Sequence, residues 1–214
     1  MCSSDLYDIS GLLQGAVLAQ LDGATGPLDL AVTDAASNQL WVLYGQGDGS
    51  FSPPIGHATG ANPMAVAAGD VNGDQATDLV VANFGSNTVS LFLAGDGFAP
   101  KRDFPVGFAP RSVALAYLNG DTNLDLIVAS QAAATVSVLI GNGHGGFWPP
   151  VPYAVGGFAF SLAVADFNGD SKLDVATGNW GTSSVTVRLN ASPSSPVSAV
   201  GLVDISSSTQ LISP

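Results

Sequence analysis

Short runs of apolar and β-branched residues alternate with turns rich in glycine, proline and asparagine along most of the chain. Runs such as T-V-S-L-F-L and T-V-S-V-L-I have the length and composition of short strands. Between residues 63 and 106 the pattern predicts four strands, at about 63–70, 77–83, 87–93 and 101–106. Glycine-rich segments such as 141–147 are predicted to be hairpin turns, because neither a G-K-[ST] motif nor a helical pattern follows them.

The best helical candidate is G-L-L-Q-G-A-V-L-A-Q-L at 11–21, but it contains two glycines. Residues 5–23 also align with residues 151–169, and this alignment places Tyr7 at the position of Tyr153. The alignment assigns this part of the chain to the same strand pattern as the rest. The sequence therefore predicts an all-β fold.

A loop rich in aspartate separates two of the predicted strands at 70–78. Its oxygen-bearing side chains occupy loop positions 1, 3, 5 and 9, which are Asp70, Asn72, Asp74 and Asp78. Gly73 supplies the backbone freedom that a tight curl needs. Carboxylate and amide oxygens without sulfur or imidazole suit a hard cation, and calcium accepts about six to eight such ligands in loose geometry.

The same loop recurs along the chain. The fourth copy carries Asp166, Asn168, Asp170 and Asp174 in the four places. The third copy keeps Asn119, Asp121 and Asp125 but has Tyr117 at the first position. The first copy keeps Asp22 and Asp29 and has one residue inserted.

The closing aspartates of the four loops, at 29, 78, 125 and 174, are spaced 49, 47 and 49 residues apart. A fixed period in this range indicates a repeat architecture in which each repeat is one supersecondary unit. Each full repeat is predicted to contain four short strands, which gives sixteen strands in all when residues 5–9 are included.

The chain is strongly acidic, and most of its acidic residues lie in these loops. All 17 acidic residues are Asp, against five Lys and Arg residues, and the net charge is −12. This balance disfavours nucleic acid and anionic lipid surfaces as partners, because both need basic patches. Cys2 is the only cysteine, so no intrachain disulfide can form. No apolar run is long enough for a membrane span, and the first residues do not read as a signal peptide.

The repeated A-[DG]-[FV]-N-G-D core, followed by T-V-[ST]-V strands and G-x-G-x-G-x-F turns, resembles FG-GAP/VCBS repeats over about residues 5–190. The resemblance implies a β-propeller of the integrin α-subunit type, with one repeat per four-stranded blade. It leaves two alternatives: four blades that close a small ring with the help of residues 5–9, or part of a larger, typically seven-bladed ring.

The resemblance also implies that the loops bind Ca²⁺. By analogy with other calcium loops, the backbone carbonyls at position 7 join the side-chain ligands. The implied metal ligands are Asp70, Asn72, Asp74, Ala76 and Asp78 in the second loop, Asp166, Asn168, Asp170, Lys172 and Asp174 in the fourth, and Asn119, Asp121 and Asp125 in the third.

After Arg188 the pattern stops, and residues 191–214 are rich in serine and proline. We expect this region to be a tail or linker after the propeller repeats of residues 1–190, although 201–206 could form one more strand. We expect the chain to be part of a larger multidomain protein.

Three functions compete. The first is a non-enzymatic propeller, secreted, on the cell surface or periplasmic, that binds a protein or glycan in adhesion and uses calcium structurally. The second is a lectin, since Phe84 and Trp180 each follow a closing aspartate by six residues and exposed aromatic rings stack on sugars; the alternative is that they fill gaps between blades. The third is a polysaccharide-degrading propeller enzyme.

Few residues in the sequence are suited to catalysis. His57 and His144 are predicted to lie in turns with no nucleophile beside them. The spacing of the paired carboxylates is better explained by metal ligation than by acid–base catalysis. We therefore expect the protein not to be an enzyme and assign no catalytic residue.

Overall fold

The structure is a computed structural model that describes residues 7, 9, 11–23, 25–192 and 200–204. Within these residues, sixteen strands form four separate antiparallel sheets of four strands each, and each sheet follows chain order. A single 3-10 turn, η1 (Ala94–Asp96), is the only helical element of the described residues. None of the described segments forms a helix long and apolar enough to cross a membrane.

The four sheets are the blades of a β-propeller. Blade 1 contains β1 (Leu13–Ala19), β2 (Asp29–Asp34), β3 (Gln39–Leu43) and β4 (Ile55–Ala58). Blade 2 contains β5 (Pro63–Gly69), β6 (Asp78–Asn83), β7 (Thr88–Phe92) and β8 (Arg102–Pro105). Blade 3 contains β9 (Pro110–Ala116), β10 (Asp125–Ser130), β11 (Thr135–Leu139) and β12 (Val151–Ala154). Blade 4 contains β13 (Phe158–Ala165), β14 (Asp174–Trp180), β15 (Ser184–Asn190) and β16 (Leu202–Asp204).

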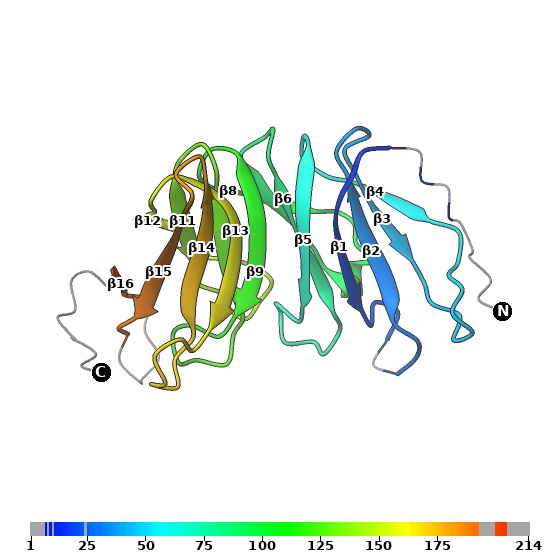
Figure 1. The fold of residues 1–214 in the computed structure, drawn as a ribbon. Coiled ribbons are helices and arrows are strands. Elements are labelled where there is room, and N and C mark those ends of the chain that lie inside the picture. The colour runs from blue at the N-terminus through cyan, green and yellow to red at the C-terminus, as the bar shows by residue number, and fades with distance from the viewer. Residues whose placement is uncertain (1–6, 8, 10, 24, 193–199, 205–214) are drawn as a thin grey trace.

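The blades lie side by side in chain order, as Figure 1 shows from β1–β4 at one end to β13–β16 at the other. The first strands of neighbouring blades contact each other, β1 with β5, β5 with β9 and β9 with β13. Blades 1 and 4 stand at opposite ends of the row (Figure 1), so the described residues do not close a ring. The small closed ring, one of the two predicted alternatives, is therefore not what the structure shows.

Three apolar cores hold the row together, one between each pair of consecutive blades. Every residue of β6 and β10 is buried, because the middle blades have a neighbour on both faces. Between blades 2 and 3, for example, Val89 and Leu91 of β7 pack with Leu126 and Val128 of β10. The alternating side chains of one strand therefore serve two different cores, as in other sheets that are buried on both faces.

The sequence-based strand assignments agree closely with the structure. The four strands predicted between residues 63 and 106 correspond to β5–β8 within one or two residues at each end. The segment 11–21 contains the strand β1 and no helix, as the repeat alignment predicted. The extra strand considered at 201–206 is β16, which pairs with β15 and forms the outer strand of blade 4.

The prediction that residues 5–9 would complete the last blade finds no support in the two described members of that segment. The hydroxyl of Tyr7 accepts a hydrogen bond from the amide of Phe51 in blade 1 at 2.6 Å. The two rings also meet edge to face, with centroids 5.8 Å apart. Tyr7 therefore lies against blade 1, whereas β16 takes the outer position of blade 4.

The cores between the blades predict the effect of a matched pair of leucine substitutions. Leu91→Ala removes a fully buried side chain between blades 2 and 3 and should lower the free energy of unfolding by about 2–5 kcal/mol. Leu28→Ala, at a side chain that is 52% exposed, should change it by less than about 1 kcal/mol. Urea denaturation of both variants measures the two values, and equal losses would show that this core is not formed.

Candidate functional site

The second loop, residues 70–78, curls around its first aspartate. Oδ1 of Asp70 accepts hydrogen bonds from the amides of Gly73 at 2.7 Å and Asp74 at 3.2 Å, and Oδ2 accepts from the amide of Gln75 at 2.8 Å. The loop thus surrounds one carboxylate with its own N–H groups, a common role of Asp in turns.

Positions 3 and 5 of the second loop extend this arrangement. Oδ1 of Asn72 accepts from the amide of Asp74 at 3.1 Å, and the side-chain amide of Asn72 donates to Oδ2 of Asp74 at 2.9 Å. Asp74 in turn accepts from the amide of Ala76 at 2.8 Å. The oxygens of positions 1, 3 and 5 therefore gather in one exposed loop.

The fourth loop, residues 166–174, repeats this geometry. Asp166 accepts from the amides of Gly169 at 2.7 Å and Ser171 at 2.9 Å, and Asp170 accepts from the amide of Lys172 at 3.0 Å. The amide of Ser171 is the main reason why the pKa of Asp166 lies below its usual value. The two loops that match the full sequence motif are thus built alike.

Backbone conformation explains why glycine is needed in these loops. Gly73 and Gly169 have φ of +79°, and Gly120 in the third loop has φ of +80°. This left-handed region strains most other residues, so the sequence-based role of Gly73 is confirmed.

The third loop, residues 117–125, differs at its first position. Tyr117 replaces the aspartate and is exposed, whereas Asn119 is buried. Asp121 keeps its bonds to the side-chain amide of Asn119 at 2.9 Å and to the amide of Asn123 at 2.8 Å. Tyr117 lines a pocket of about 290 Å³ with Asp170 and Lys172 of the fourth loop.

The closing aspartate of each loop has a separate and more buried role. In blade 2, Oδ2 of Asp78 accepts from the amide of Val71 at 2.9 Å, and Oδ1 accepts from the amide of Ala94 at 2.9 Å. Val71 follows the end of β5, Asp78 begins β6, and Ala94 follows the end of β7. One carboxylate therefore ties three strands of the blade together.

All four blades contain this carboxylate clamp, by which we mean Asp29, Asp78, Asp125 or Asp174 with its two amide donors. All four side chains are fully buried. The remaining donors are the amides of Leu21 and Gly45 for Asp29, of Leu118 and Gly141 for Asp125, and of Phe167 and Asn190 for Asp174, at 2.7–2.9 Å.

Burial acts against the charge of the clamps. Desolvation raises the pKa of Asp125 to about 6, although the amides of Gly141 and Leu118 oppose the rise. Desolvation also raises the pKa of Asp78, and the nearby charges of Asp74 and Asp70 raise it further. A cation at the second loop would offset this repulsion.

The predicted metal ligands therefore fall into two groups. Positions 1, 3 and 5 gather in the exposed loops, and their donor chemistry fits a hard cation. The aspartate at position 9 instead accepts hydrogen bonds from backbone amides. Within the part of the chain that the structure describes, no three His, Cys, Asp or Glu side chains converge in the manner of a metal centre.

A cluster of exposed aromatic residues lies on blade 4. Phe158, Phe160 and Trp180, here called the aromatic group, come from β13 and β14. The Trp180 ring centroid is 6.3 Å from that of Phe158 and 6.4 Å from that of Phe160. Phe160 and Trp180 line an open, mostly apolar pocket of about 330 Å³. Trp180 is 64% exposed, so it does not fill a gap between described blades.

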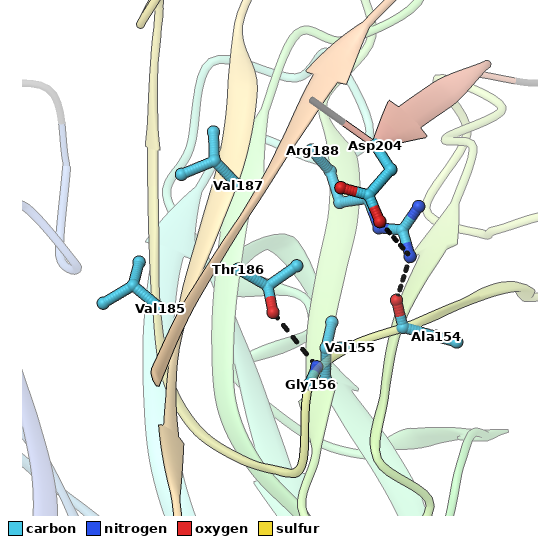
Figure 2. Close-up of a pocket in the computed structure, with 8 residues that line it drawn as sticks. All are labelled: Ala154, Val155, Gly156, Val185, Thr186, Val187, Arg188 and Asp204. Atoms are coloured by element: carbon cyan, nitrogen blue, oxygen red, sulfur yellow. Dashed lines mark hydrogen bonds and ion pairs between the residues drawn. The ribbon is translucent and has the colours of Figure 1, made fainter. Parts of the chain in front are cut away.

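A third pocket, of about 420 Å³, lies where β15 meets the segment that joins blades 3 and 4 (Figure 2). The amide of Gly156 donates to Thr186 at 3.0 Å, and Arg188 donates to the carbonyl of Ala154. Arg188 also lies 3.9 Å from the carboxylate of Asp204. Because its positive charge is already balanced, this pocket offers little attraction to an anion.

The two histidines are in different settings. His57 lies in β4 and not in a turn as predicted, and its ring meets Phe98 and Phe92 at 5.7 and 6.4 Å. Burial lowers the pKa of His57, which favours the neutral ring. His144 is in the glycine-rich turn, where its amide donates to Asn142 at 2.9 Å.

The sequence profile of the FG-GAP-like repeat matches the chain three times, over residues 24–81, 70–128 and 117–177. These matches begin within the first loop, include the other three loops and cover most of the described strands. The chain belongs to the FG-GAP-like repeat family. Among curated protein sequences, no significant relative was found.

Solved structures with the same fold include a lectin and a lyase. A lectin of Agrocybe aegerita that recognises non-reducing terminal N-acetylglucosamine is similar over 87% of this chain and 51% of its own, with 19% identity and a TM-score of 0.56. Virginiamycin B lyase from Staphylococcus aureus is similar over 89% of this chain and 60% of its own, with 10% identity and a TM-score of 0.54. The FG-GAP-like chain thus spans only about half to three fifths of these proteins. At such identities the likeness shows the fold alone.

Sequence reasoning missed two features of the FG-GAP-like repeats. It assigned the closing aspartates to the metal only, although their place directly before an apolar strand was a signal of burial. It also considered Trp180 without Phe158 and Phe160, whose pairing across β13 and β14 depends on strand register.

The raised pKa of Asp125 predicts a pH dependence of stability. An aspartate in the unfolded chain titrates near about 3.9, so between about pH 4 and 6 the folded state binds more protons than the unfolded state. The contribution of Asp125 to the free energy of unfolding should therefore fall as pH rises through this window, by up to about 2–3 kcal/mol.

Asp125→Asn removes this titration and also one amide acceptor. In the presence of a chelator, the stability advantage of the wild type over Asp125→Asn should shrink as pH rises from about 4 to 6. Urea denaturation across this range measures it, with Asp48→Asn, at an exposed turn residue, as the control. Parallel curves for the wild type and Asp125→Asn would contradict the assignment.

Proposed function

We propose that this FG-GAP-like propeller is a non-enzymatic interaction module that binds a protein or a glycan and is stabilised by calcium. The observation that carries the proposal is the matching geometry of the second and fourth loops, in which Asp70, Asn72 and Asp74 correspond to Asp166, Asn168 and Asp170. The equivalent construction of two loops in separate blades supports a shared role. Their oxygen donors suit calcium better than softer metals.

Calcium would be held by positions 1, 3 and 5 of these loops, together with the backbone carbonyls of Ala76 and Lys172. The bound ion would supply positive charge next to Asp78 and Asp174, whose buried carboxylates tie the strands together. This role is structural: the ion stiffens the end of the blade and thereby the surface that meets the partner. The proposal places the module in a secreted, cell-surface or periplasmic setting, where calcium sites of low affinity can be filled.

A glycan ligand is favoured by the aromatic group. Phe158, Phe160 and Trp180 present rings to solvent beside an open pocket, and exposed rings of this kind stack on the apolar faces of sugars. Arg111 lies over the ring of Phe160 at 3.7 Å from its centroid and fixes that side of the group. The same propeller fold serves glycan recognition in the Agrocybe aegerita lectin, which supports the lectin candidate by analogy of fold alone.

Calcium dependence is tested by thermal unfolding. The melting temperature should rise by a few degrees when the calcium concentration is far above the dissociation constant, because the ion binds the folded state only. Asp74→Ala should lose about half of this rise if the second and fourth loops contribute equally. Asp48→Ala removes the same charge from an exposed turn outside the loops and should keep the full rise. A wild type that responds neither to calcium nor to a chelator would contradict the proposal.

The glycan candidate is tested on an array that includes oligosaccharides with terminal N-acetylglucosamine. Trp180→Ala should weaken binding about tenfold or more, since it removes the most exposed ring of the aromatic group. Trp148→Ala, at another exposed tryptophan outside the group, should bind like the wild type. A folded protein that binds no glycan would reject the lectin candidate and leave a protein partner.

A further inference from the structure

One position of the repeat has a different environment in blade 4 from that in the other blades. The second residue of the third strand is Leu40, Val89 or Val136 in blades 1–3, and each is 0% exposed because the next blade packs on it. The equivalent residue of blade 4, Val185, is 71% exposed. Val185 therefore belongs to a blade face that has the residues of an interface but no described blade against it.

The two faces of β15 are clearly different. Figure 2 shows Val185 and Val187 pointing away from Thr186 and Arg188. Thr186 and Arg188 are held to blade 3 through Gly156 and Ala154. Val185 and Val187 are directed to the opposite side, where a fifth blade would stand. We call this side the leading face of blade 4.

Blade 1 has the complementary surface at the other end of the row. Leu18 of β1 pairs with Leu30, as Ala68 pairs with Leu79, Leu115 with Leu126 and Val164 with Val175. Ala68, Leu115 and Val164 are half-buried in the core shared with the preceding blade. Leu18 is 56% exposed, so the trailing face of blade 1, which contains Leu18, lacks the blade that covers its equivalents.

Tyr7 marks the edge of the trailing face at which the outer strand of a preceding blade would meet blade 1. Phe147 of blade 3 meets Phe104, from the outer strand of blade 2, with ring centroids 5.3 Å apart. Phe51 is the equivalent of Phe147, because each closes the same glycine-rich turn by a bridge to Gly45 or Gly141. Tyr7 contacts Phe51 at 5.8 Å and so holds the place of an outer-strand residue of a preceding blade.

We propose that the leading face of blade 4 binds the trailing face of blade 1 of a second copy of this chain, so that two copies close one ring. The two faces are the two sides of the interface that occurs three times within the chain, which makes them complementary. A head-to-tail contact of this kind closes when the rotation permits. One chain spans 51% of the similar lectin and 60% of the similar lyase, so two copies together match or exceed the length of either protein.

The proposal agrees with the position of the aromatic group. The equivalents of Trp180 in blades 2 and 3 are Phe84 and Gln131. Both remain partly exposed to solvent even though another blade follows theirs. Trp180 would likewise stay at the rim of the new junction, where a ligand can reach it. Two exposed apolar faces would leave solvent at the same time, which favours association.

Association is measured by analytical ultracentrifugation and light scattering over a wide range of protein concentration. The wild type should have twice the mass of the 21.4 kDa chain. Val185→Asp and Leu18→Asp should each weaken dimerisation at least about a hundredfold, because each buries an unpaired carboxylate at both junctions. Both residues are exposed in the single chain, so thermal unfolding at low concentration should show that both variants fold. Val151→Asp, on the outer strand of blade 3, is the matched control and should dimerise like the wild type.

A mixture of the two variants identifies the faces. When Val185→Asp meets Leu18→Asp, one of the two junctions joins two unmodified faces, so mixed dimers should form more strongly than dimers of either variant alone. A wild type that stays monomeric at all concentrations would overturn the proposal. Large open polymers would overturn the closed ring, and a dimer that is insensitive to Leu18→Asp would overturn the pairing of blade 4 with blade 1.

Discussion

The buried carboxylate at the start of each second strand is the interaction on which the blade depends. Its two oxygens accept amides from the ends of the first and third strands, so one side chain aligns three strands at one end of the sheet. Hydrogen bonds to a charged group are each worth about 1.5–3 kcal/mol, and an amide without an acceptor in this buried place would be costly. The residue must be short and must accept twice, which explains why Asp stands at all four positions.

The clamp and the loop are two parts of one electrostatic system. The clamp places a carboxylate in a dry environment, where the raised pKa of Asp125 shows the cost of its charge. The loops add further carboxylates, which raise the pKa of Asp78. Backbone amides neutralise part of this charge, as they do around Asp70 and Asp166. A cation at the loop would complete the neutralisation, so the calcium that we propose would support the strands and the surface that a partner would meet.

The fold was predictable from the sequence because each repeat carries the same local signals. The strands of blade 2, the hairpin turns and the left-handed Gly73 all follow from residue type and spacing. Features that depend on tertiary neighbours were not predictable. Val185 occupies the same position in its repeat as Val89, and it is exposed only because no described blade lies beside it. From sequence alone Asp78 was predicted to be a metal ligand, because its burial and its two amide donors were not known. His57 was predicted to lie in a turn, because the pairing of its strand with β3 could not be foreseen.

Hydrogen exchange at the clamp amides tests the central claim most directly. In Asp78→Asn, the amides of Val71 and Ala94 compete for a single acceptor oxygen, so at least one of them should exchange about tenfold faster than in the wild type. The amides of Leu118 and Gly141, which belong to the unmodified clamp of blade 3, should keep their protection in the same sample. Unchanged exchange at both Val71 and Ala94 would contradict the account, because the carboxylate would then not be what holds the three strands in place.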